Sequence, residues 1–149
     1  MLIALEQSWL AAALKSSFYV YPSVNALHIL AIGGLFTSVV LLDLRTLGLL
    51  PAQSAAFTPL ARRLALGAFA IAAATGLALL SVRATEYAVN PAFRLKLVLI
   101  ALAGLNFLAF RIVTRKPTGS VPRTGRGLAV LSIMLWTGIA LCGRFIAFV

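Results

Sequence analysis

The chain has 149 residues, of which 62% are hydrophobic and only 11% are charged. So few charges cannot cover the surface of a water-soluble globule, and the composition therefore predicts a protein solvated by lipid. The formal net charge of +10 does not indicate nucleic acid, because the 13 Lys and Arg residues stand singly or in pairs between apolar runs. We expect the lipid bilayer as a partner and no nucleic acid, with the basic residues meeting the head groups.

The first residues are not typical of a signal peptide. Residues 1–8 contain Glu6 and no Lys or Arg, and the apolar stretch Trp9–Leu14 is shorter than the hydrophobic region of a signal. Apolar side chains instead recur at helical spacing beside polar ones, at Leu5, Trp9, Ala12 and Ala13. This pattern predicts a short amphipathic helix that lies in the membrane interface.

Four apolar runs predict an all-α fold, an integral membrane bundle of four transmembrane helices in a single domain over residues 1–149. The predicted spans cover residues 22–42, 64–82, 93–113 and 128–148. The first two each hold about 19 residues without a charge other than a proton on His28, which makes about 28 Å of helix and matches the hydrocarbon core. The third span requires Lys96 and Arg111 to extend their charges to the interfaces. Pro22 and Pro91 fit the first turns of the first and third helices.

The distribution of Lys and Arg predicts the orientation. One side of the four spans carries eight basic residues, namely Arg45, Arg62, Arg63, Arg111, Arg115, Lys116, Arg123 and Arg126. The other side carries five, namely Lys15, Arg83, Arg94, Lys96 and Arg144. The positive-inside rule places the larger set in the cytoplasm. We therefore expect a multi-pass protein of the bacterial inner membrane with both termini in the periplasm.

Small side chains form stripes on two of the predicted helices. They are Ala68, Ala72 and Gly76 on the second helix, and Gly138 with Cys142, following Met134, on the fourth. Such stripes let neighbouring backbones approach closely, and we interpret both as packing surfaces. The stripe on the second helix predicts that this helix is central in the bundle.

His28 is the main candidate for chemistry, because an ionisable residue inside a span is costly and marks a functional site. Tyr21, Asn25 and His28 stand at i, i+4 and i+7, so they share one face of the first helix. His28 is expected about 9 Å inside Pro22, at the level of Cys142 on the fourth helix.

His28 is interpreted either as a cofactor ligand or as a structural residue, and both interpretations stay open. His28 and Cys142 suit a soft metal such as copper, with Met134 about two turns deeper on the same stripe. A b-type haem would use His28 from each of two chains, or His28 with Met134. The structural alternative is a histidine that hydrogen-bonds a facing helix.

The remaining polar residues are interpreted structurally. Asn106 lies in the middle of the third span, where an amide is expected to hydrogen-bond a neighbouring helix. Asp43 and Arg45 close the first span, and we expect a local pair or a contact with the Arg62–Arg63 loop. The three carboxylates all lie outside the deep part of the predicted spans, so a carboxylate proton relay lacks its parts. The single cysteine excludes an intrachain disulfide.

Four segments carry a resemblance that covers nearly the whole chain: YPSVNALHILAIG, LLDLRTLGL, NPAFRLKLVLIALAGLNFLAFR and LSIMLWTGIALCGRFIAF. They resemble a family of small bacterial four-helix membrane proteins known mainly as a domain of unknown function. More distantly, the chain is similar to the copper-resistance D and membrane cytochrome b type of bundle. The resemblance implies the fold and an inner-membrane location, and His28 matches a histidine early in helix one. Asn25 replaces an acidic residue of the relatives and Phe110–Arg111 replaces Phe-His, which weakens a haem or metal assignment.

From these patterns we expect a non-enzymatic membrane component with a redox- or metal-linked role. It would work beside other membrane subunits or as a homo-oligomer. The rival is a small transporter or channel subunit with a polar path past Tyr21, Asn25, His28 and Asn106, or a purely structural partner subunit.

Overall fold

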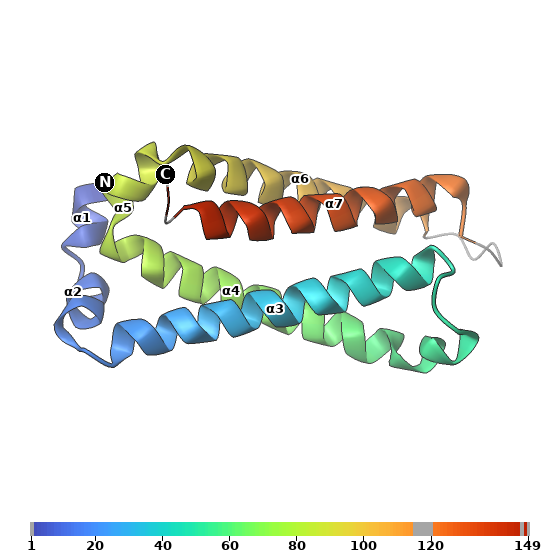
Figure 1. Ribbon diagram of the computed structural model, residues 1–149, viewed down its shortest axis with the longest axis horizontal. Helices are drawn as coiled ribbons and strands as arrows, with labels where there is room; N and C mark the ends of the chain where they lie inside the picture. The colour runs from blue at the N-terminus through green and yellow to red at the C-terminus, as the bar shows by residue number, and fades with distance from the viewer. Residues whose placement is uncertain (1, 115–120, 147, 149) are drawn as a thin grey trace.

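The structure is a computed structural model that describes residues 2–114, 121–146 and 148. Its elements are α1 (Leu2–Glu6), α2 (Trp9–Ser16), α3 (Val20–Thr46), the 3-10 helix η1 (Ala52–Phe57), α4 (Thr58–Val82), α5 (Ala84–Val89), α6 (Pro91–Val113) and α7 (Arg123–Phe145). Within these residues the fold is all-α, as predicted, and four long helices run side by side (Figure 1).

Four helical stretches are long and apolar enough to cross a membrane: Val20–Thr46, Ala52–Val82, Pro91–Val113 and Arg123–Phe145. Each contains most of one predicted span, and together they make this chain a multi-pass membrane protein. The first stretch is longer than the predicted span 22–42 at both ends, and the last one ends at Phe145 instead of 148.

Local sequence signals fix the helix ends. Gly48, two residues after the end of α3, adopts φ 79°. Its N–H bonds the carbonyl of Arg45, and the N–H of Leu49 bonds the carbonyl of Leu44. These two hydrogen bonds form a Schellman motif, which ends the helix and requires the left-handed backbone conformation that glycine adopts readily. At the other boundary, the side chain of Asn90 accepts the N–H of Phe93 and caps the start of α6, directly before Pro91.

The four long helices form two antiparallel hairpins, α3 with α4 and α6 with α7 (Figure 1). The hairpins meet chiefly through α3 and α7. In the first hairpin, α3 therefore packs against two long helices, α4 and α7, whereas α4 packs mainly against α3. The prediction that α4 is the central helix is wrong. Large side chains such as Leu66 and Leu77 leave the rest of α4 exposed, towards lipid.

The small-residue stripe of α4 does pack, and it packs against α3. A Cβ placed on Gly34 of α3 would lie 3.8 Å from the Cβ of Ala68, and Ala72 is buried. In the second hairpin, a Cβ on Gly138 would lie 3.2 Å from Leu99 Cδ1, beside the buried cluster of Ala103, Leu135 and Ile139. Small residues thus lie at the closest approaches of both hairpins, as predicted, whereas Met134 of the second stripe is 66% exposed and does not pack.

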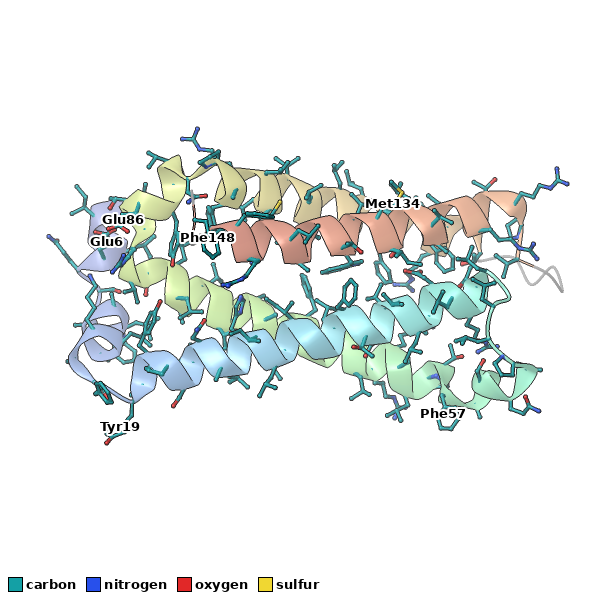
Figure 2. The ribbon with its side chains drawn as sticks, in the orientation of Figure 1. Glu6, Tyr19, Phe57, Glu86, Met134 and Phe148 are labelled. Carbon is teal, nitrogen blue, oxygen red and sulfur yellow. The ribbon has the colours of Figure 1, made fainter. Side chains whose placement is uncertain are left out.

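The amphipathic segment at the N-terminus is two short helices instead of one. Ser8 divides them, and its hydroxyl accepts the N–H of Ala11 and caps α2. Ala11 and Leu14 are buried, and α2 packs on α3 and α4 at one end of the bundle. Trp9 is 81% exposed, and Tyr19 points away from the protein (Figure 2), which suits an aromatic anchor at a membrane interface.

Candidate functional site

His28 of α3 faces α4 and contacts Thr75. Its Nδ1 lies 2.8 Å from Thr75 Oγ1, and Thr75 Oγ1 itself donates to the carbonyl of Ile71 at 2.6 Å. The hydroxyl has only one hydrogen, so the network assigns the shared proton to His28 Nδ1, which donates to Thr75. The other ring nitrogen, Nε2, then carries a lone pair that this bond does not use.

Gly76 makes this contact between helices possible. A Cβ built on Gly76 would lie 3.0 Å from His28 Cε1, which is closer than real Cβ contacts normally come. The imidazole therefore packs directly on the backbone of α4, and its position is fixed by both the Thr75 hydroxyl and the Gly76 surface.

Lys96 of α6 points into the bundle. Its Nζ lies 3.3 Å from where a Cβ on Gly143 of α7 would stand, and the ammonium acts electrostatically on His28 and on Cys142. Among the described residues no carboxylate pairs with it, because the single ion pair there joins Arg83 and Glu86. Lys96 was expected to extend its charge to the membrane interface, and the structure places its ammonium beside α7.

We call His28, Thr75, Lys96 and Cys142 the His–Lys site. One residue comes from each long helix, so the site lies where the two hairpins meet. It combines one cation, an imidazole, a hydroxyl and a thiol, with no carboxylate among the four. His28 and Lys96 are only half-buried, so both keep accessible surface. The Lys96 ammonium is the group of this set that favours a ligand with negative charge over a metal cation.

The other predicted site residues lie apart from this site. Asn25 is exposed, and Tyr21 is directed towards Tyr87 of α5, with which it interacts. Met134 is 66% exposed and points outwards from α7 (Figure 2). The structure therefore brings Cys142 to the vicinity of Lys96 but does not bring Met134 to His28.

A second polar cluster lies nearer the opposite end of the bundle. Asn106 donates to the carbonyl of Leu128 on α7 at 3.0 Å, which is the kind of interhelical hydrogen bond expected for it. Asp43 is buried and hydrogen-bonds Ser132 of α7. The expected pair of Asp43 with Arg45 is absent from the described residues, since Arg45 bonds Thr58 Oγ1 instead.

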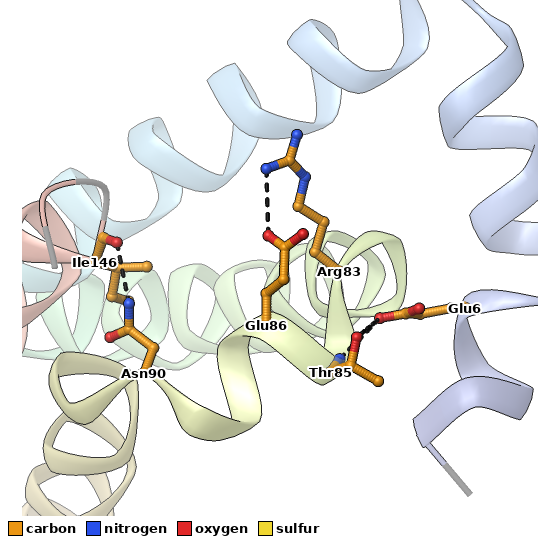
Figure 3. A network of polar contacts seen from close by, with 6 residues as sticks. All are labelled: Glu6, Arg83, Thr85, Glu86, Asn90 and Ile146. Carbon is orange, nitrogen blue, oxygen red and sulfur yellow. Dashed lines mark hydrogen bonds and ion pairs between the residues drawn. The ribbon is translucent and has the colours of Figure 1, made fainter.

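Polar contacts at the end that carries α1, α2 and α5 tie the chain together (Figure 3). Glu6 Oε1 accepts the N–H of Thr85 at 2.8 Å and its hydroxyl at 2.7 Å, and Arg83 pairs with Glu86 at 3.3 Å. Asn90 donates to the carbonyl of Ile146 at 3.2 Å and so joins the start of α6 to the end of α7. The Thr85 N–H and then its hydroxyl hold the pKa of Glu6 below its usual range.

A haem or copper centre within one chain does not fit these residues. No group of three or more His, Cys, Asp or Glu side chains able to hold a metal occurs in the described parts of the chain. Met134 is turned outwards, and the Lys96 ammonium beside His28 disfavours another cation. His28 is oriented as a ligating histidine would be, with Nδ1 donating to Thr75, but Cys142 is the one further potential metal ligand in the His–Lys site.

Searches against protein-family models, curated proteins and solved structures each returned no match.

Two members of the His–Lys site were not predicted as site residues. Thr75 is an uncharged residue of the second predicted span, and the sequence pattern carries no signal that singles it out. The inward direction of Lys96 could have been predicted from its spacing to Arg94. Successive helical residues are about 100° apart, so Lys96 lies roughly opposite Arg94, and only one of the two can face lipid. Arg94 is exposed and bonds the carbonyl of Ala88, which turns Lys96 inwards.

Proposed function

We propose that this chain is a bacterial inner-membrane protein that binds an anionic amphiphile, such as an acidic lipid, with its head group at the His–Lys site. The observation that carries the proposal is the Lys96 ammonium, which lies between the hairpins without a carboxylate partner among the described residues. An uncompensated ammonium inside a membrane protein is costly. A phosphate or carboxylate head group would offset that cost by a charge-assisted hydrogen bond.

The neighbours of Lys96 support a head group instead of a free inorganic ion. The helices α4 and α6, which supply Thr75 and Lys96, also expose large apolar side chains, with Leu77 and Leu95 as examples. A ligand with a charged head and an apolar tail therefore matches both kinds of surface.

The proposed orientation follows from the basic residues, with the His–Lys site in the half facing the periplasm and both termini on that side. Reporter fusions test it: a reporter after Val149 should behave as periplasmic, and one in the loop 114–126 as cytoplasmic. The reverse pattern would refute the orientation but would leave the binding proposal standing.

Binding is tested by thermal melting in detergent with added phosphatidylglycerol or phosphatidylcholine. Phosphatidylglycerol should stabilise the wild type and Lys96→Arg, and should stabilise Lys96→Gln much less. Arg94→Gln is the matched control, because it removes one positive charge at the same depth from an exposed position. Equal losses in Lys96→Gln and Arg94→Gln would mean that general surface charge, and no specific site, attracts the lipid.

A redox role is the second proposal, and it rests on the orientation of His28, whose Nδ1 bonds Thr75 and leaves the lone pair to Nε2. Because one chain supplies a single histidine, the compatible form is a b-type haem held by His28 of two chains in a homodimer. A Soret band in the purified protein that His28→Gln removes would support it, and a colourless protein would exclude it.

The separation of the two polar regions gives the transporter interpretation less support than the lipid-binding proposal. The His–Lys site and the Asp43–Asn106 region are separated along the bundle by the apolar cluster of Ala103, Leu135 and Ile139. A path past Tyr21, Asn25, His28 and Asn106 would have to cross this layer, and Asn25 is exposed outside it.

A further inference from the structure

Asp43 is a buried carboxyl group at the contact between the two hairpins. It lies three residues before the end of α3, it is 9% exposed, and it hydrogen-bonds Ser132 of α7. Its Oδ2 is fully buried and meets no hydrogen-bond donor among the described residues. A carboxylate in this position keeps a charge that the protein only partly compensates.

The basic residues at this end do not supply the missing charge in the described structure. They are Arg45 on α3, Arg62 and Arg63 on α4, Arg111 on α6, and Arg123 and Arg126 on α7. Arg45 bonds Thr58 and the carbonyl of Ala55, and the other five are exposed. Among the described residues no charged group acts on the Asp43 carboxyl, and the polar side chain that contacts it is Ser132.

Asn106 adds a second unsatisfied acceptor close by. Its Nδ2 donates to Leu128 while its Oδ1 is buried without a donor among the described residues, and the side chain is 7% exposed. Leu128 and Ser132 are one turn apart on α7, so α3 and α6 both place an unpartnered oxygen at the same turn. The last turn of α3 also carries the negative end of the helix dipole, which further disfavours an anion there.

We propose that Asp43 binds a small monovalent cation at the contact between α3 and α7, either a proton on its carboxyl group or a metal ion such as Na⁺. In the first case a proton from water forms the O–H bond on the carboxylate, which becomes a neutral acid. In the second case the carboxylate stays ionised and its oxygen ligates the ion. Because α3 and α7 make the main contact between the hairpins, the bound cation stabilises their association.

Two readouts on the purified wild-type protein test this proposal. Infrared spectroscopy at neutral pH detects the carbonyl stretch of a protonated carboxyl group, and melting in Na⁺ against choline detects a metal ion. The chain has only three acidic side chains, so the double variant Glu6→Gln, Glu86→Gln leaves Asp43 as the only one. Asp43→Asn is the variant that removes the site and keeps its shape.

A protonated-acid band that persists in the double variant supports the proton. Ionised carboxylates together with a melting temperature about 3 °C higher in Na⁺, an increase absent from Asp43→Asn, support the metal ion. Ionised carboxylates without a Na⁺ effect would overturn the proposal, and so would a Na⁺ effect that Asp43→Asn retains. Even if Asp43→Asn does not fold, the wild type alone can overturn the proposal, by showing ionised carboxylates and no effect of Na⁺ on melting.

Discussion

The hydrogen bond between His28 and Thr75 makes a quantitative prediction about how the first hairpin is held. His28→Ala removes the 2.8 Å bond and the contact of the ring with Gly76. An interhelical hydrogen bond in a membrane protein contributes about 1 kcal/mol, and we assign about 1 kcal/mol more to the lost van der Waals contacts of a half-buried ring. We expect His28→Ala to lower the free energy of unfolding by about 2 kcal/mol, and His28→Gln to cost about half of that, because the amide can still donate to Thr75.

A double-mutant cycle isolates the hydrogen bond itself. Thr75→Val removes the hydroxyl and keeps the shape of the side chain, and unfolding in detergent micelles is measured for both single variants and the double variant. The coupling energy between positions 28 and 75 should be about 1 kcal/mol. If His28→Ala costs the same in the Thr75→Val background as in the wild type, the hydrogen bond does not hold α3 to α4 and the reasoning fails.

Three further predictions concern packing and pH. Gly76→Ala should lower the melting temperature because its Cβ would stand 3.0 Å from the His28 ring, whereas Gly67→Ala, with nothing within 4 Å, should not lower it. Ala72→Leu should lower it too, by separating α3 from α4, and a wild-type melting curve would contradict that contact. The lowered pKa of Glu6 means that its ionised form stabilises the contact of α1 with α5, so the contact is lost as the pH falls through that lowered pKa. Trp9 fluorescence should report the release, and Glu6→Gln should show it already at neutral pH.

The long helices could be predicted from the sequence because each depends on a local property, the length of an apolar run. The ends were less predictable where a specific cap decides them. The N–H bonds around Gly48 extend α3 to Thr46, beyond the limit suggested by Asp43 and Arg45. The predicted first span ended before Asp43 because its side chain is charged. In the structure α3 continues through Asp43, whose carboxyl group is buried against α7.

The arrangement of the helices could not be predicted, because a stripe of small residues shows that a helix packs but not how many neighbours it has. Ala72 and Gly76 pack on α3, and α4 still lies at the edge of the arrangement. The inward turn of Lys96 likewise depends on which face of α6 meets α7, and that is a property of the assembled bundle. His28 could be identified because an ionisable side chain inside a membrane span is energetically costly. Its partner Thr75 could not be identified, because the contact depends on which face of α4 is turned towards α3.

The central claim, that the His–Lys site binds an acidic amphiphile, is tested most directly by mass spectrometry of the protein extracted from its native membrane in mild detergent. We predict that an acidic lipid or fatty acid stays bound to the wild type and to Arg94→Gln, and that it is lost from Lys96→Gln. A wild-type protein that retains no acidic amphiphile, or retains it equally in Lys96→Gln, would contradict the account.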